Sequence, residues 1–323
     1  MPLLELENVT KHFPVFGGVF RRMVGKVHAV TEVSFSLEKG ETLGLVGESG
    51  SGKSTLGRSI LRLSDPISGS IRFEGKDLVS MGARELKHTR QHMQMIFQDP
   101  FSSVDPRMTV GSIVEEPLRI HGIGNNETRR EKAAELLEKV GIQPESIRQY
   151  PHEFSGGQRQ RIGIARAIAL KPKLIIADEP VSALDVSIQS QILNLLKEIR
   201  EEMNLACIFI AHNMAVVKHI SDRIAVMYAG RIVELGESES VCQDPRHPYT
   251  KALISSIPVP RPGKKNKKQI LQGDVPSPLN PPRGCAFHLR CPHVEEICKR
   301  EIPPLNENKV HPEKPHWVAC HLQ

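Results

Sequence analysis

The segment GESGSGKS, residues 47–54, constrains the fold of this chain more than any other. It follows ETLGLVG (41–47), a short apolar run that predicts a strand, and it precedes STLGRSILRL, which has a helical pattern. Glycines in such a loop let successive backbone N–H groups approach phosphate oxygens, and the following helix adds its positive end. We therefore predict a nucleotide-binding loop, with Lys53 on the β- and γ-phosphates and the Ser54 hydroxyl on Mg²⁺.

The rest of the chain alternates strand-like and helix-like segments. KLIIADE (173–179) and LACIFIAH (205–212) are short apolar runs followed by helical periodicity, and QSQILNLLKEIREEM (189–203) predicts an amphipathic helix. This alternation predicts an α/β fold with a parallel sheet covered on both sides. Residues 85–160 have a helical pattern and no comparably buried strand, so we expect a helical insertion there.

Polar residues follow two of these predicted strands. Asp178 and Glu179 end KLIIADE, and His212 ends LACIFIAH. Ligands of doubly wound sheets bind at the carboxyl ends of the strands, so Gly47, Glu179 and His212 should share one edge. We expect Asp178 to hold Mg²⁺ through water, Glu179 to polarise the attacking water, and His212 to sense the γ-phosphate. The alternative for each is a structural role, such as capping a helix.

A second anion-binding segment is FSGGQRQRIGIARA, residues 154–167. Ser155 suits a helix N-cap, and Gly156 and Gly157 leave backbone N–H groups open to an anion. Two such sites in one chain are redundant unless the second serves a nucleotide held elsewhere. With this segment the sequence resembles the ATP-binding subunits of ATP-binding-cassette (ABC) transporters, over residues 1 to about 235 and with every motif in order.

This resemblance implies a role for each motif. SGGQ matches the family's signature, which presses on ATP bound to the opposite subunit, and SALD (182–185) matches its D-loop. Gln98 matches the Q-loop, which joins Ser54 and Asp178 around Mg²⁺, and His212 matches the switch histidine. The implied catalytic residues are Glu179, His212 and Lys53. The implied ATP-binding residues are Phe13 (stacked on adenine), Gly47, Glu48, Ser49, Gly50, Ser51, Gly52, Lys53, Ser54, Thr55, Gln98, Ser155, Gly156, Gly157, Gln158, Asp178 and Asp185.

Three further segments resemble the ATPases of dipeptide and oligopeptide importers, in particular the second of their two non-identical ATPases. They are MQMIFQDPFSSVDPRMTV (93–110), GKSTLGR (52–58) and RHPYTKALISSIP (246–258). The resemblance implies ATP hydrolysis that drives peptide uptake. The implied partners are a second ATPase subunit (a heterodimer, with a homodimer as the alternative), two membrane permease subunits and an external peptide-binding protein, with no nucleic acid. It also implies a place at the cytoplasmic face of the cell membrane.

Four of the six cysteines lie in the last 39 residues: Cys285, Cys291, Cys298 and Cys320, separated by five, six and 21 residues. No secretory signal is seen at the N-terminus and no apolar run nears the ~20 residues of a bilayer span, so we expect a cytosolic chain with reduced thiols. Ligand softness alone allows zinc or an iron–sulfur cluster. The spacings between these cysteines are wider than the two to four residues that usually separate paired zinc ligands. Histidines that could replace a thiolate on zinc are His288, His293, His316 and His321.

The importer resemblance favours a [4Fe–4S] cluster on these four cysteines, with zinc as the alternative and a stapling role in the tail. Prolines mark the boundary of this tail, since fourteen of the 24 lie after residue 240. The ABC resemblance implies a RecA-like P-loop core with an antiparallel β subdomain and a helical subdomain (about 85–160) in residues 1–235. A small C-terminal metal-binding extension should fill residues 236–323.

Other functions are possible for such a cassette. A net charge of +6 would suit an ATPase acting on DNA or ribosomes, but such relatives need a long coiled-coil insertion or two cassettes, and the sequence has neither. A second alternative is an importer of another solute, such as nickel. A third is a redox sensor in which the cysteines regulate an unrelated partner.

Overall fold

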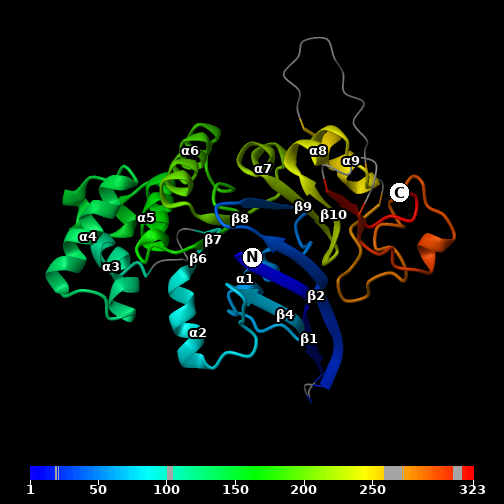
Figure 1. The fold of residues 1–323 in the computed structure, drawn as a ribbon, viewed down its shortest axis with the longest axis horizontal. Helices are drawn as coiled ribbons and strands as arrows, with labels where there is room; N and C mark the ends of the chain where they lie inside the picture. Colours follow the sequence, from blue (N-terminus) through cyan, green and yellow to red (C-terminus); the bar gives the residue numbers. More distant parts are fainter. Residues whose placement is uncertain (19, 21, 100–104, 258–270, 272, 308–314) are drawn as a thin grey trace, which may run out of the picture. The chain divides into compact units, whose positions relative to one another are not determined.

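The computed structural model describes residues 1–18, 20, 22–99, 105–257, 271, 273–307 and 315–323. The chain divides into two compact units (Figure 1). Unit 1 comprises Met1–Leu37, Thr42–Val79 and Ala211–Gln323, and unit 2 comprises Glu38–Glu41 and Ser80–Ile210. Part of the importer-like segment 93–110, residues 100–104, lies outside the described residues. Across the described ranges, no helix combines the length and apolarity needed to span a membrane.

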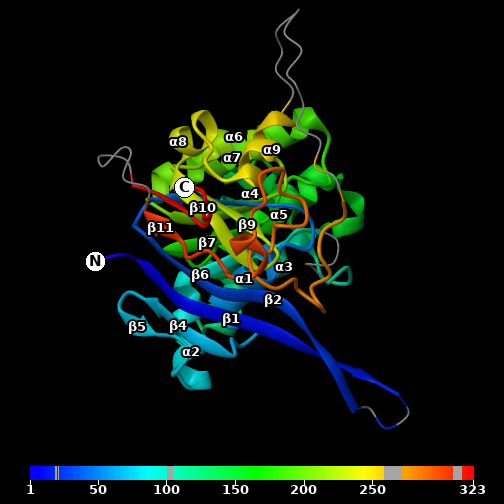
Figure 2. The same cartoon turned by 90° about the vertical axis from the view of Figure 1, so that its right-hand side faces the viewer.

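Unit 1 contains an antiparallel sheet with the strand order β2-β1-β4-β5. Leu4 in β1 pairs with Leu37 in β2 and with Phe73 in β4, and all three side chains are buried. β1 and β2 form a long hairpin, drawn in blue in Figure 2. This is the antiparallel sheet that the family resemblance implies. Its strands are β1 (Leu4–Gly17), β2 (Arg22–Leu37), β4 (Ser68–Phe73) and β5 (Lys76–Asp77).

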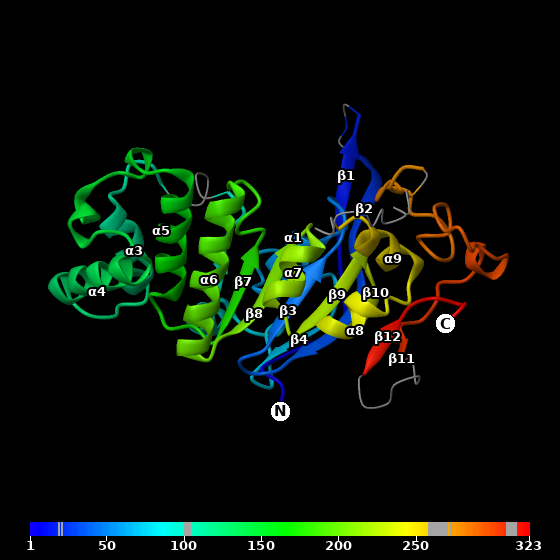
Figure 3. The same cartoon turned by 90° about the horizontal axis from the view of Figure 1, so that it is seen from above.

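A second sheet in unit 1 carries the start of the phosphate-binding loop. Its strand order is β11-β12-β10-β9-β3, with β3 parallel to β9 and the other pairs antiparallel. Every residue of β3 is buried, as the apolar run predicts. α8 packs against β9 and β10 (Figure 3). The elements are β3 (Thr42–Val46), α1 (Lys53–Ile60), α7 (Met214–Ile220), β9 (Arg223–Tyr228), β10 (Arg231–Glu237), α8 (Ser238–Gln243), α9 (Pro248–Ser255), β11 (Asn306–Glu307) and β12 (His316–Val318).

The cysteine-containing tail joins this second sheet. β12 pairs with β10, so that Val318 lies opposite Glu234 and Trp317 lies opposite Leu235. Between α9 and β11 the described tail has little regular structure except a 3-10 turn, Ile297–Lys299, that contains Cys298. The predicted domain boundary at residue 235 falls within β10. It stays a prediction, because β12 of the tail pairs with β10 and so belongs to the same sheet as the core strands.

Unit 2 contains parallel strands in the order β8-β7-β6 together with helices. The strands predicted from KLIIADE and LACIFIAH are confirmed as β7 and β8, and the predicted amphipathic helix is confirmed as α6. α3, α4 and α5 pack on one another (Figures 1 and 3). The elements are α2 (Ala83–Thr89), a 3-10 turn (Arg90–His92), β6 (Met93–Ile96), α3 (Val110–Ile120), α4 (Asn126–Lys139), 3-10 turns (Pro144–Arg148 and Pro151–Glu153), α5 (Gly156–Ile168), β7 (Leu174–Asp178), α6 (Val186–Met203) and β8 (Ala206–Ala211).

The expectation that residues 85–160 lack a buried strand is wrong. β6 lies in this range, and Met93, Met95 and Ile96 are all buried where the strand pairs with β7. The strand has only four residues, and two of them are methionines, which are not among the residues enriched in strands. The pairing with β7 therefore decides its conformation, and the local pattern does not reveal it.

Candidate functional site

The phosphate-binding loop connects β3 to α1 in unit 1. Gly52, just before α1, has a φ of 101°, a left-handed conformation that favours glycine. A Cβ there would lie 2.0 Å from the carbonyl oxygen of Ala29 in β2. At Gly47 a Cβ would lie 2.2 Å from the carbonyl oxygen of Met227 in β9. Glycine is therefore required at both positions, because the loop packs directly on the backbone of neighbouring strands.

Lys53 begins α1, and its side chain is buried. Its Nζ donates hydrogen bonds to the carbonyl oxygens of Gly47 at 2.8 Å and Glu48 at 3.0 Å, and to the Ser51 hydroxyl at 3.4 Å. The ammonium is thus held inside the loop by neutral acceptors, which phosphate oxygens can replace with stronger, charge-assisted bonds. The other predicted loop residues lie on the loop or in the first turn of α1: Ser49, Gly50, Ser54 and Thr55.

Two residues of the C-terminal tail contact this loop through Glu48. Arg290 donates from Nη1 to Oε2 of Glu48 at 2.8 Å and from Nη2 to Oε1 at 3.2 Å. The Tyr249 hydroxyl accepts a hydrogen bond from the Glu48 backbone N–H at 2.8 Å. The hydrogen bonds with Glu48 raise the pKa of Arg290, so the guanidinium stays charged. The sequence reveals neither contact, because Tyr249 and Arg290 are 201 and 242 positions away from Glu48.

The predicted acidic pair lies at the end of β7 in unit 2. Asp178 is almost completely buried, and Glu179 follows it with a φ of 45°, which is uncommon for a residue with a side chain and tends to occur at functional sites. The Glu179 backbone N–H donates to the Ile210 carbonyl oxygen at 3.0 Å. Its Oε2 accepts a hydrogen bond from Nε2 of Gln98 at 3.0 Å. The structure therefore brings Gln98 and Glu179 into direct contact.

The SGGQ segment begins α5 in unit 2. The Gln158 backbone N–H donates to Oγ of Ser155 at 3.3 Å, and the Ser155 N–H donates to Oε1 of Gln158 at 2.9 Å. This reciprocal pair is a capping box, so the predicted N-cap at Ser155 is confirmed. Gly156 and Gly157 form the first turn, where the backbone N–H groups point out of the helix. Asp185 is the exposed N-cap residue of α6.

Two further residues predicted for the ATP site belong to unit 1. The Phe13 ring on β1 is 39 % exposed, and Nζ of Lys11 lies 5.0 Å from its centroid. His212 follows β8 and is exposed. Gly47 and His212 belong to unit 1 and Glu179 to unit 2, so their predicted common edge stays a prediction.

The four tail cysteines lie near one another in unit 1. Cys298 is buried and the other three are half-buried. The Cys285 N–H donates to the Cys298 carbonyl oxygen at 2.8 Å. Burial, together with the charges of Cys298, Cys320 and Cys291, raises the pKa of the Cys285 thiol to about 11. The four thiols are therefore within electrostatic range of each other.

No disulfide links these cysteines in the part of the chain that the structure describes, and no three His, Cys, Asp or Glu side chains there are arranged to hold one metal ion. Two of the four histidines considered as zinc ligands have partners outside the cysteine group. Nε2 of His316 lies 2.7 Å from Oε1 of Glu234, and Nε2 of His321 lies 3.0 Å from the Glu301 carbonyl oxygen. The structure thus shows a four-thiol segment, but not the metal site that the resemblance implies.

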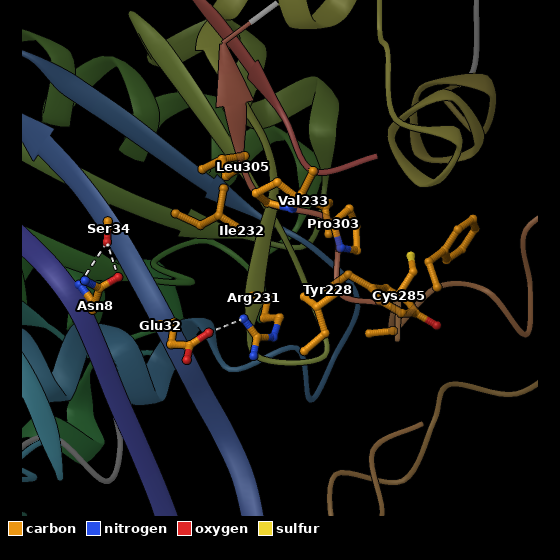
Figure 4. Close-up of a pocket in the computed structure, with 15 residues that line it drawn as sticks. Asn8, Glu32, Ser34, Tyr228, Arg231, Ile232, Val233, Cys285, Pro303 and Leu305 are labelled. Carbon is orange, nitrogen blue, oxygen red and sulfur yellow. Dashed lines mark hydrogen bonds and ion pairs between the residues drawn. The ribbon is translucent and has the colours of Figure 1, made fainter. Parts of the chain in front are cut away.

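A cavity of about 450 Å³ lies beside the tail in unit 1 (Figure 4). Figure 4 shows Glu32 and Arg231, paired at 2.8 Å, on one side and Cys285 on the other. Further walls come from residues 302–305 and from Tyr228. None of the predicted ATP-binding residues lines this cavity, so it is separate from the phosphate-binding loop.

Comparison with known proteins decides the family. The profile of the ABC transporter family matches residues 30–182, and that of the oligopeptide/dipeptide transporter C-terminal region matches residues 233–298. The chain is 54 % identical to the oligopeptide transport ATP-binding protein AppF of Bacillus subtilis, over 99 % of this chain and 97 % of AppF. This chain belongs to the ATP-binding subunits of oligopeptide and dipeptide ABC transporters.

Other relatives of this ABC subunit agree. It is 53 % identical to the probable peptide ABC transporter ATP-binding protein y4tS of Sinorhizobium fredii, over 99 % of this chain and 90 % of y4tS. Among solved structures, the dimeric ATP-binding cassette MJ0796 in a post-hydrolysis state with ADP and Pi matches with a TM-score of 0.65 and 29 % identity, covering 73 % of this chain and 98 % of MJ0796. The predicted ABC ATPase of the peptide-importer type is confirmed.

Proposed function

We propose that this ABC subunit binds and hydrolyses ATP at residues 47–54 and that the hydrolysis drives peptide uptake through membrane partners. The observation that carries this proposal is the loop itself, where the buried Lys53 ammonium is held by carbonyl oxygens that phosphate can replace. Peptides are favoured as the solute because relatives that match this chain over nearly all of their length are named for oligopeptide or peptide transport. Another solute, such as nickel, is the alternative.

Nucleotide binding would use residues of both units. Lys53 would exchange its bonds to the Gly47 and Glu48 carbonyls for bonds to the β- and γ-phosphates. The exposed ring of Phe13 is available to stack on adenine. Ser54, Gln98 and Asp178 would hold Mg²⁺, since hydroxyl, amide and carboxylate oxygens suit this hard cation, which neutralises phosphate charge when it is bound.

In hydrolysis, the Glu179 carboxylate would accept a hydrogen bond from the attacking water and so polarise it. This carboxylate is oriented by the hydrogen bond from Gln98 and the Glu179 backbone by the bond to Ile210, so the side chain is held in place for this role. His212 would contact the same phosphate and report its cleavage. These roles are the ones that the family resemblance implies.

The SGGQ helix start supports a second ATPase subunit as a partner. Its N–H groups at Gly156 and Gly157 form an anion site on α5, in addition to the one at Lys53 on α1. We propose that Ser155–Gln158 and Asp185 contact ATP held by the other subunit of a dimer. The MJ0796 cassette, which is dimeric, supports this arrangement. A non-identical second ATPase, two permease subunits, an external peptide-binding protein and a place at the cytoplasmic face of the membrane complete the proposed system.

We further propose that Cys285, Cys291, Cys298 and Cys320 hold a [4Fe–4S] cluster that staples the tail. The thiols affect one another electrostatically, yet they are not drawn together around a single ion. The cysteine spacings of five, six and 21 residues are wider than those of usual zinc pairs, and together with the importer resemblance they favour a cluster over zinc. His316 and His321 are engaged elsewhere, which further weakens the zinc alternative.

The tail proposal is tested by the metal content of anaerobically purified protein. We expect iron and acid-labile sulfide near four per chain, with a visible absorption band that reductant bleaches, and loss of both in Cys291→Ser. The control is Cys242→Ser, which removes a thiol that is not one of the four proposed ligands. A content of about one zinc per chain, without sulfide, would show that the cysteines hold zinc and not a cluster.

The transport proposal is tested with Glu179→Gln in cells that make no other copy of the subunit. Loss of the water-activating carboxylate should lower ATP hydrolysis by about 100-fold or more and abolish uptake of a labelled peptide. The control is Glu201→Gln, an exposed site on α6. Peptide uptake that survives in Glu179→Gln cells would refute the proposal, and loss of nickel uptake alone would identify the alternative solute.

A further inference from the structure

The phosphate-binding loop and the C-terminal tail meet at Glu48 in unit 1. The two-point contact of Arg290 with the Glu48 carboxylate has the planar fork geometry that suits a carboxylate, at 2.8 and 3.2 Å. The Arg290 side chain is 7 % exposed and that of Glu48 is 28 % exposed, so solvent screens this pair only in part. The contact therefore restrains the loop more strongly than a surface ion pair would.

Tyr249 restrains the backbone of the same residue. Its hydroxyl accepts the Glu48 N–H at 2.8 Å, and its side chain in α9 is completely buried. The ring lies 4.7 Å from Tyr228 and 5.6 Å from Phe287, measured between centroids. Since Phe287 lies three residues before Arg290, one aromatic cluster supports both contacts to Glu48.

Glu48 passes this restraint to Lys53. The Glu48 carbonyl oxygen accepts a hydrogen bond from Lys53 Nζ at 3.0 Å, so the backbone position of Glu48 helps to set where the ammonium lies before phosphate replaces this bond. The Glu48 carboxylate also places a negative charge on a loop that binds phosphates. Arg290 neutralises that charge, and without it the carboxylate would repel an anionic ligand.

We propose that Arg290 and Tyr249 are positioning residues for nucleotide binding, and that they couple ATP affinity to the fold of the cysteine-containing tail. Arg290 directly precedes Cys291 in the segment that the Cys285–Cys298 backbone hydrogen bond closes. Any change that unfolds this segment withdraws the guanidinium from Glu48. This inference rests on the proposed function, since it assumes that residues 47–54 bind ATP.

The test is an equilibrium titration of the full-length chain with a fluorescent ATP analogue and Mg²⁺, at low and at high salt. Arg290→Gln should weaken binding by about tenfold to hundredfold, because it removes charge-assisted hydrogen bonds and leaves the carboxylate unbalanced. The affinity of Arg290→Lys should lie between those of wild type and Arg290→Gln, since lysine keeps the positive charge but cannot make the two-point contact. Arg283→Gln, an exposed arginine of the same tail, is the matched control.

A double variant separates positioning from general stability. Glu48→Gln combined with Arg290→Gln removes the unbalanced carboxylate but not the lost restraint on the loop, so its affinity should recover only in part, to a value between that of Arg290→Gln and that of wild type. A double variant that binds as weakly as Arg290→Gln, or an Arg290→Gln that binds like wild type, overturns the inference.

Tyr249→Phe provides an independent arm if the arginine variants fail to fold. It removes a single hydroxyl and should weaken binding by about threefold to tenfold. Wild-type affinity in this variant would exclude Tyr249 from the proposal. If the wild-type chain itself fails to bind the analogue, the proposed function fails with it, whereas binding that is equal in all variants refutes only the coupling to the tail.

Discussion

Replacement of Glu234 by glutamine should destabilise unit 1, because this carboxylate joins the core to the tail. Glu234 lies in β10 and is completely buried. Oε1 accepts the Arg246 backbone N–H at 2.7 Å and faces Nε2 of His316 at 2.7 Å. Oε2 accepts the His247 N–H at 2.9 Å. One side chain thus fixes β12 of the tail and the chain entering α9.

The magnitude follows from the number of acceptors that glutamine lacks. An amide keeps one oxygen and replaces the other by an NH₂ group, which must face one of these backbone N–H donors. The variant therefore loses at least one bond to a charged acceptor and leaves a buried N–H group unsatisfied, at a cost of about 2–4 kcal/mol. For a unit of this size that corresponds to a decrease in Tm of about 4–16 °C.

Thermal unfolding of the full-length chain, followed by circular dichroism, measures this effect. The control is Glu239→Gln on α8, which makes the same chemical change at an exposed site and should leave the Tm within about 1–2 °C of wild type. A Glu234→Gln chain that unfolds at the temperature of the control would refute the reasoning, since it would show that the buried carboxylate is not needed as an acceptor.

Two other variants test the loop and the entry to α9. Gly52→Ala should abolish binding of a fluorescent ATP analogue, because its Cβ would meet the Ala29 carbonyl oxygen at 2.0 Å, whereas Gly18→Ala, also at positive φ but without such a neighbour, should bind normally. Burial lowers the pKa of His247 from 6.5 to about 4. As the pH falls, the His247 side chain is protonated in the unfolded chain before it is protonated in the folded one. Its contribution to the free energy of unfolding is therefore complete above about pH 6.5 and decreases by up to about 3 kcal/mol as the pH falls towards 4. Urea unfolding at several pH values should show that loss, and His247→Asn, which keeps an N-cap acceptor, should reduce it; an unchanged pH dependence would contradict this account.

The parts of the site that the sequence reveals are those in which neighbouring residues act together. The glycines and Lys53 of residues 47–54 stand next to each other in the chain, and the β3 strand before them is a plain apolar run. Ser155 and Gln158 are three residues apart, so their capping box follows from local helix chemistry. Sequence also identified Asp178 and Glu179 as a pair, because an apolar strand directly precedes them.

Tertiary structure alone decided the contacts between distant residues and the elements with weak local signals. β6 became a strand by pairing with β7, although its methionine-containing pattern does not predict one. Glu234 reaches His316 because the tail adds β12 to the sheet beside β10, and Arg290 reaches Glu48 where Phe287 packs on Tyr228 and Tyr249. Local patterns report which residues are buried or capped within a few positions, but which buried groups meet depends on how the chain returns on itself, and that follows only from the packing of the whole unit.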